Sequence, residues 1–131
     1  MTHALVSVLV FASLLSGAEQ KRKQPKLMKV EVVHAEARRV ENRIELDGSI
    51  RNAGDVPIEG LVLRFEFLSS ALKPVATRNG PLTEKVLDPG DACAFSFALR
   101  DEPRAVKVRI TAVDRRTDEP AVVAPGPYGI Q

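Results

Sequence analysis

Apolar and polar residues alternate with a period of two from residue 29 onward, and this alternation constrains the fold more than any other feature of the sequence. The segment 43–51 carries charged or polar residues on one face and, on the other, Ile44, Leu46, Gly48 and Ile50. Such alternation is typical of an antiparallel strand with one face buried and one face in solvent. No convincing amphipathic helix follows the first 18 residues. The sequence therefore predicts an all-β fold.

Turn residues separate further segments of this kind, which we predict as strands at about 29–34, 59–69, 75–78, 86–87, 92–99 and 105–114. The inward-facing residues expected in the three longest are Leu61, Leu63, Phe65, Phe67, Cys93, Phe95, Phe97, Leu99, Val106, Val108, Ile110 and Ala112. About seven short strands separated by turns indicate an antiparallel β-sandwich. Four of the five phenylalanines lie in 59–69 and 92–99. We therefore expect these two inner strands to face each other across the core.

The turns between these segments have recognisable residues. In NAGDVP, Asn52 is expected to cap its own backbone, Gly54 to supply a positive φ, and Pro57 to end strand pairing. The pair Pro89-Gly90 indicates a type II turn. Residues 115–131 contain three prolines and two glycines after Glu119, so we predict a flexible tail. The alternative for its AVVA stretch is a short edge strand.

The N-terminus resembles a targeting segment. An apolar run from Ala4 to Leu15 precedes Ser16-Gly17-Ala18, whose small residues suit signal-peptidase cleavage before Glu19. As a helix, this run would span only about 18 Å of a bilayer core of about 30 Å. We therefore predict a cleaved signal peptide at 1–18 and an exported protein, periplasmic or extracellular. The alternative is an uncleaved membrane anchor, because the segment before the run lacks Lys and Arg.

A basic linker follows at 19–28, ahead of the β-sandwich domain predicted at 29–114. Five positive charges lie in this linker or directly after it, on Lys21, Arg22, Lys23, Lys26 and Lys29. We interpret the run as a solvated linker; the alternative is contact with anionic lipid headgroups. The whole chain has 19 basic and 17 acidic residues. This balance argues against a nucleic-acid partner.

The stretch GSIRNAGDVP, from Gly48 to Pro57, is similar to the second strand and turn of FxLYD domains, and LDPGDACAF, from Leu87 to Phe95, resembles their Pro-Gly turn. The name-giving motif aligns with FEFLS and is retained only at Phe65. The resemblance covers roughly residues 29–114. It implies an immunoglobulin-like sandwich in an exported or membrane-attached bacterial protein, without established catalytic activity and without functional residues to carry over.

Residues suited to chemistry are few. After removal of the signal, His34 is the only histidine, and we interpret it as a solvated strand residue; a Ser-His-Asp triad is the alternative. Cys93 is the only cysteine and is interpreted as a buried hydrophobe instead of a reactive thiol. The carboxylates Asp47, Asp55, Asp88 and Asp91 are interpreted as turn-capping groups, with calcium binding as the alternative. We predict no catalytic residues, no metal site and no cofactor.

The outward faces of two strands offer a candidate binding face for a protein partner, formed by Arg64, Glu66, Lys107 and Arg109. The alternative for these residues is simple cross-strand ion pairing. An edge strand near Val75–Arg78 could also accept a strand from a partner. The function predicted from the sequence is a non-catalytic binding module of the bacterial cell envelope. The alternatives are a membrane-anchored structural domain whose linker contacts lipid, and an enzyme with an unrecognised site.

Overall fold

The computed structural model describes residues 28–82, 86–115 and 121–131, which contain strands and no helix. The strands are β1 (Lys29–Val40), β2 (Arg43–Asn52), β3 (Ile58–Glu59), β4 (Leu61–Leu68), β5 (Pro74–Pro81), β6 (Val86–Leu87), β7 (Ala92–Arg100), β8 (Lys107–Asp114), β9 (Ala121–Val123) and β10 (Tyr128–Gly129). The predicted signal peptide at 1–18 and most of the predicted linker lie outside the described residues.

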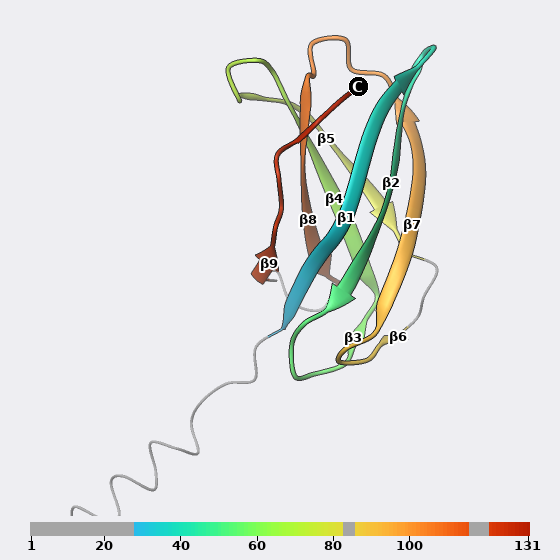
Figure 1. Cartoon of the computed structure of the whole chain (residues 1–131), viewed down its shortest axis with the longest axis vertical. Coiled ribbons are helices and arrows are strands. Elements are labelled where there is room, and N and C mark those ends of the chain that lie inside the picture. Colours follow the sequence, from blue (N-terminus) through green and yellow to red (C-terminus); the bar gives the residue numbers. More distant parts are fainter. Residues whose placement is uncertain (1–27, 83–85, 116–120) are drawn as a thin grey trace, which may run out of the picture.

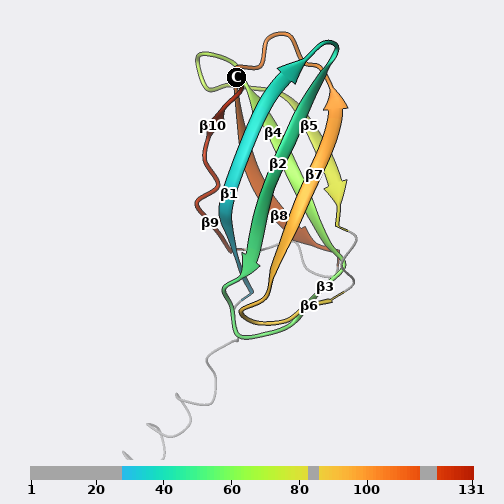
Figure 2. The ribbon, with the colours of Figure 1, turned by 45° about the vertical axis from the view of Figure 1, so that its right-hand side comes forward.

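Two four-stranded sheets pack face to face (Figures 1 and 2). The first sheet has the order β7-β2-β1-β9 and the second has the order β10-β8-β4-β5, while β3 and β6 form a small separate pair. All pairings between the long strands are antiparallel. The predicted all-β sandwich architecture is therefore confirmed.

Strand β1 extends to Val40, well beyond the predicted segment. A β-bulge at Val33 changes which residues face inward. Val32 is opposite Ile50, whereas His34 is opposite Ser49, so Val33 is an extra residue on β1. Before the bulge the even-numbered residues of β1 are buried, and after it the odd-numbered Ala37 is buried. The bulge interrupts the period of two, which is why the sequence pattern ends too early.

Gly48 lies in the middle of β2, next to the bulged part of β1. A Cβ atom at this position would overlap the backbone oxygen of His34 and the ring of Phe95. We expect Gly48→Ala to lower the free energy of unfolding by about 1–3 kcal/mol, because the backbone cannot yield as a side chain can. Chemical denaturation would measure the effect. Gly129→Ala is the control, since a Cβ there meets nothing within 4 Å; equal losses in both variants would contradict the prediction.

Aromatic rings from both sheets meet in the core. The ring centroid of Phe65 on β4 lies 6.1 Å from that of Phe95 and 5.4 Å from that of Phe97, both on β7. The prediction that these strands face each other is therefore confirmed. β7 is nevertheless an edge strand of the first sheet and not an inner one, and Phe97 and Leu99 are only half-buried.

Two inward or outward assignments made from the pattern are wrong. Val106 is 41% exposed, because it precedes β8 in the loop where Ala105 takes the buried position. The alternation of 59–69 assigns Leu68 to the outward face, but its side chain is fully buried. The register between β4 and β5 shifts between Phe67 and Leu68, so the strict alternation ends there. The other inward residues predicted on β8, namely Val108, Ile110 and Ala112, are buried.

Cys93 is only 8% exposed, which confirms its predicted burial. The thiolate is the reactive form of cysteine, and burial in apolar surroundings disfavours it and blocks access. We expect native protein to react with a thiol reagent such as 5,5′-dithiobis(2-nitrobenzoate) at least about tenfold more slowly than protein in denaturant. The absorbance of the thiolate that the reagent releases would measure both rates. Equal rates would show that the β7 register described here is wrong.

Asn52 organises the lower end of the sandwich from a fully buried position. Its side-chain nitrogen donates to the backbone oxygens of Val56 and Leu87, at 2.8 and 2.9 Å. Its side-chain oxygen accepts from the Gly54 N–H at 3.0 Å. The predicted capping of the local backbone is therefore confirmed. Since this bond holds the turn, Gly54 does not need the positive φ that we predicted, and it is not among the residues with one.

The Pro89-Gly90 turn agrees with the sequence. Gly90 has a φ of 86°, and the Asp91 N–H donates to the Asp88 oxygen at 3.0 Å. These are the requirements of a type II turn with glycine at its third position. The Gly90 N–H also donates to the Asn52 oxygen at 2.8 Å. The turn is thereby joined to the buried asparagine.

The C-terminal segment differs from the predicted flexible tail. Strand β9 pairs in parallel with β1, and β10 pairs antiparallel with β8, so residues 121–131 cross from the first sheet to the second. Gln131 donates to the Ala37 oxygen and accepts from the Arg39 N–H, at 2.9 and 2.8 Å. The alternative of a short edge strand is confirmed for 121–123. These backbone bonds offset the entropy lost on ordering a segment rich in proline and glycine.

Candidate binding face

The four residues of the predicted binding face lie together on the outer face of the second sheet. Arg64 and Glu66 come from β4, and Lys107 and Arg109 come from the neighbouring strand β8. Glu66 is directly opposite Arg109 in the register of these strands. The alternating residues of β4, including Phe65, point into the core, so the outward placement follows from the pleat of the sheet.

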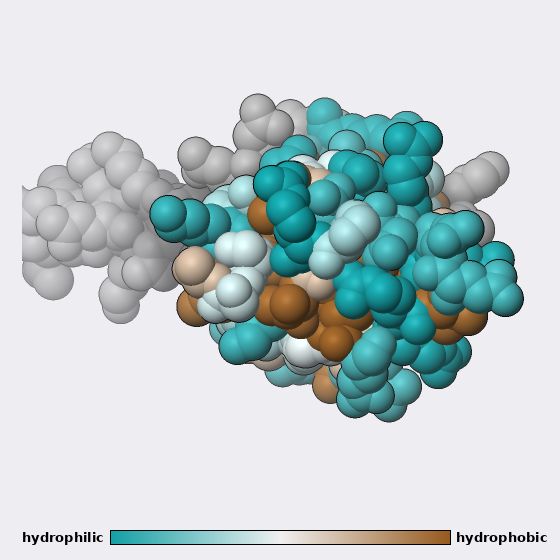
Figure 3. Space-filling model, turned by 90° about the horizontal axis from the view of Figure 1, so that it is seen from above, coloured by the Kyte–Doolittle hydropathy of each residue, from teal (hydrophilic) through white to brown (hydrophobic). Residues whose placement is uncertain are grey.

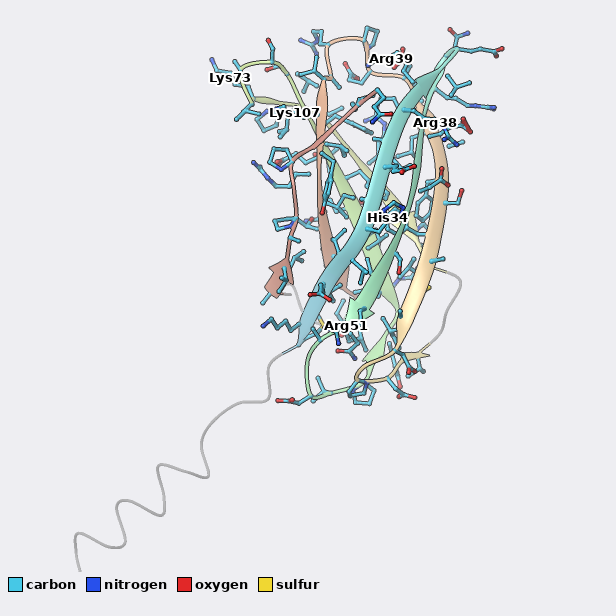
Figure 4. The ribbon with its side chains drawn as sticks, in the orientation of Figure 1. His34, Arg38, Arg39, Arg51, Lys73 and Lys107 are labelled. Carbon is cyan, nitrogen blue, oxygen red and sulfur yellow. The ribbon has the colours of Figure 1, made fainter. Side chains whose placement is uncertain are left out.

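An ion pair joins two of the four residues. The guanidinium of Arg109 lies 2.8 Å from the carboxylate of Glu66, so the alternative of cross-strand ion pairing holds for these two residues. Arg64 and Lys107 are exposed and form no ion pair within the described residues. Three positive groups and one negative group therefore give this face a net positive charge. Figure 4 labels Lys107 near the start of β8.

A groove of about 360 Å³ runs along this face between the arginines and the C-terminal segment. Its lining combines both arginines with neutral residues of β8 and of the C-terminal segment: Arg64, Arg109, Thr111, Ala112, Val113, Val122 and Pro125. One wall is thus charged and the other is mostly apolar. An extended peptide with an acidic side chain would find both kinds of contact here.

The wall formed by the C-terminal segment is held by two hydrogen bonds. The Ile110 N–H of β8 donates to the Pro125 oxygen at 2.8 Å, and the hydroxyl of Tyr128 donates to the Ala124 oxygen at 2.6 Å. Burial raises the pKa of the Tyr128 phenol above its ordinary value. We did not predict Val122 or Pro125 as site residues, because a flexible tail would not form one wall of a groove.

His34, the histidine considered above as a candidate catalytic residue, lies on the outer face of the first sheet. His34 is exposed and lies within β1 (Figure 4), opposite Ser49, and not at the end of the strand. Asp47 accepts hydrogen bonds from Ser96 at 2.6 Å and from Arg38 at 3.4 Å. Within the described part of the chain, no side-chain hydrogen bond links His34 to Ser49 or to Asp47. Among the described residues, His34 therefore does not form a Ser-His-Asp arrangement with Ser49 and Asp47.

The four carboxylates considered for calcium are dispersed. Asp47 lies within β2, whereas Asp55, Asp88 and Asp91 belong to the loops at the lower end. Across residues 28–82, 86–115 and 121–131, no group of three or more His, Cys, Asp or Glu side chains is placed to hold a metal ion. The same part of the chain has no helix with the length and hydrophobicity needed to cross a bilayer.

The upper end of the sandwich has a mixed surface. Seen from above, apolar patches lie among mostly hydrophilic side chains (Figure 3). Leu72 and Val106 are 48% and 41% exposed in the loops at this end. Arg39 fixes one of these loops, because its guanidinium lies 2.8 Å from Asp101 and donates to the Ala105 oxygen at 2.9 Å. The sequence pattern did not indicate this anchoring role.

Comparisons with known proteins do not identify a family for the chain. A scan against models of protein families finds no match, and a search among curated proteins finds none either.

Proposed function

We propose that this chain is a non-catalytic β-sandwich module that binds an acidic segment of a protein partner in the groove beside Arg64 and Arg109. The observation that carries the proposal is the pairing of a positively charged wall with an apolar wall on one sheet face. Arg64 is the central group, because it is exposed and has no acidic partner within the described residues. Its planar guanidinium can bind a carboxylate through two parallel hydrogen bonds.

The apolar part of the groove favours binding of a peptide over binding of a free anion. Val113, Val122 and Pro125 offer carbon surface for the aliphatic portion of a bound side chain. The volume of about 360 Å³ is at the small end of the range for ligand pockets. It suits one or two side chains of an extended segment. Arg109 contributes less charge than Arg64, since Glu66 already neutralises it.

The proposal extends to family and location. The resemblance of Gly48–Pro57 and Leu87–Phe95 to FxLYD domains supports an immunoglobulin-like module of the bacterial cell envelope. The apolar run before Ala18 supports export with cleavage before Glu19. Intact mass and N-terminal sequencing of the protein from fractionated cells would test this. A soluble species beginning near Glu19 agrees with export, whereas a membrane-bound species that retains Met1 favours the anchored alternative and lipid contact by the linker.

Binding to a fluorescein-labelled oligoglutamate peptide, followed by fluorescence anisotropy, would test the groove. We expect Arg64→Ala to weaken binding about five- to tenfold, as for loss of one solvent-exposed hydrogen-bonding group. Binding of the original chain should also weaken as salt rises, because the contacts are exposed to solvent. The matched control is Arg38→Ala, which removes an exposed arginine from the opposite face of the sandwich. Equal weakening in both variants, or no binding by the original chain, would contradict the proposal.

A further inference from the structure

Strand β7 is the edge of the first sheet (Figure 1). The residues just outside it, Asp91 and Asp101, hydrogen-bond to Asn52 and Asn42 at the two ends of β2. Hydrogen-bonded pairs alternate along an antiparallel ladder, so the odd-numbered residues of β7 bond to β2. The even-numbered residues therefore direct their N–H and C=O groups away from the sheet: Ala92, Ala94, Ser96, Ala98 and Arg100. Within the described residues, no other backbone pairs with them.

The other long edge strand, β5, is better protected against strand addition. It begins at Pro74 and ends at Pro81, and proline has no N–H to donate. The Leu82 N–H donates to the Leu61 oxygen, so the even-numbered residues of β5 hydrogen-bond to β4. The backbone groups of the odd-numbered residues, Pro81 among them, therefore point away from β4. β7 has no proline, and none of its residues before Arg100 is charged. Natural sheets use proline and charged residues on edge strands to prevent unwanted pairing, so an edge strand without them is available for pairing.

We propose that β7 pairs antiparallel with β7 of a second copy of this chain, which joins two first sheets into one continuous sheet. The charges at the two ends of β7 favour this occupant. Asp88 and Asp91, before the strand, are exposed, and Arg100, at its end, is also exposed. Arg43 lies directly opposite Arg100 on β2, and neither forms an ion pair within the described residues. The acidic residues that follow Arg100 are already paired within the chain, Asp101 with Arg39 and Glu102 with Arg78 and Arg104. Two-fold antiparallel pairing therefore brings Asp88 and Asp91 of each copy toward Arg43 and Arg100 of the other.

The side chains of β7 allow this approach. In a register centred on Ser96, the backbone groups of all five even-numbered residues can hydrogen-bond to the second copy, with Ala94 opposite its Ala98. The small side chains of Ala94, Ser96 and Ala98 offer no steric obstacle on the outer face. On the inner face, Phe97 and Leu99 are half-buried at the open edge. A second strand would cover their remaining exposed carbon surface, which favours association.

Sedimentation velocity of the full 131-residue chain over a range of concentrations would test the proposal. We expect a concentration-dependent species with twice the 14.3 kDa mass of the chain. Ala98→Pro removes an outward N–H without removing a bond to β2, so we expect the dimer dissociation constant to rise about tenfold or more. Thr77→Pro is the matched control, because it removes an outward N–H from β5 and should leave the dimer unchanged.

The charges provide a second test that does not depend on proline. Arg100→Glu should raise the dissociation constant about three- to tenfold, since it places like charges together at both ends of the pair. Adding Asp91→Lys to this variant should restore the dimer, because the charges are then exchanged. A chain that stays monomeric at every concentration would overturn the proposal. A dimer that weakens equally in Ala98→Pro and Thr77→Pro, or one that the charge exchange does not restore, would also overturn it.

Discussion

Replacing Phe65 with alanine is expected to lower the free energy of unfolding by about 3–5 kcal/mol. The side chain of Phe65 has no exposed surface, and its ring packs against Phe95 and Phe97 of the opposite sheet. The change removes buried carbon surface and leaves a cavity between two sheets that cannot close fully. A loss of this size is a large part of the total stability of a small domain, which is about 5–15 kcal/mol.

Urea denaturation followed by far-ultraviolet circular dichroism would measure this loss. The control is Val33→Ala, because Val33 is 54% exposed in the bulge of β1 and its truncation creates no cavity. We expect that control to change the stability by less than about 0.5 kcal/mol. A loss below about 1 kcal/mol for Phe65→Ala would mean that the three rings do not form the centre of the core.

The second large effect is expected at Asn52, where leucine has the same branched shape and number of side-chain heavy atoms but no polar atoms. Asn52→Leu would leave the backbone oxygens of Val56 and Leu87 and the N–H of Gly54 without their present partners. Each buried polar group left unsatisfied costs about 1–3 kcal/mol. Some of these groups would reach water by local opening of the loops. We therefore expect a total loss of about 3–5 kcal/mol.

The same denaturation experiment would measure the effect of Asn52→Leu, and amide hydrogen exchange at Gly54 would locate it. Exchange at this amide should accelerate even under conditions where the variant remains folded. Asn79→Leu is the control, because Asn79 is exposed on β5 and forms no hydrogen bond among those described. If both asparagine variants lose equal stability, the side-chain bonds of Asn52 do not hold the lower end together.

The sequence was most informative where strands keep one face buried throughout. In β2, β4 and β8 the alternation predicted the strand and most of its inward residues, and Leu46, Leu63 and Ile110 are buried as expected. It failed where β1 has its bulge, because one extra residue reverses the inward and outward positions. Bulges depend on the partner strand, which a single segment of sequence does not describe.

The candidate binding face shows the same division. The outward positions of Arg64, Glu66, Lys107 and Arg109 follow from the pleat of their own strands, so the sequence predicted that they lie on one side of a sheet. Val122 and Pro125 complete the groove only because the C-terminal segment pairs with β1 and contacts β8. Their own sequence context, rich in proline and glycine, indicated a flexible tail.

Local patterns thus determined the all-β class, the burial of Cys93, the cap at Asn52 and the turn at Pro89-Gly90, because each depends on side chains or backbone angles close together in the chain. Only the tertiary structure decided that β7 is an edge strand and that residues 121–131 join the two sheets. Strand neighbours are chosen by backbone hydrogen bonds, which every residue except proline can donate and accept, and by how apolar faces far apart in the sequence pack.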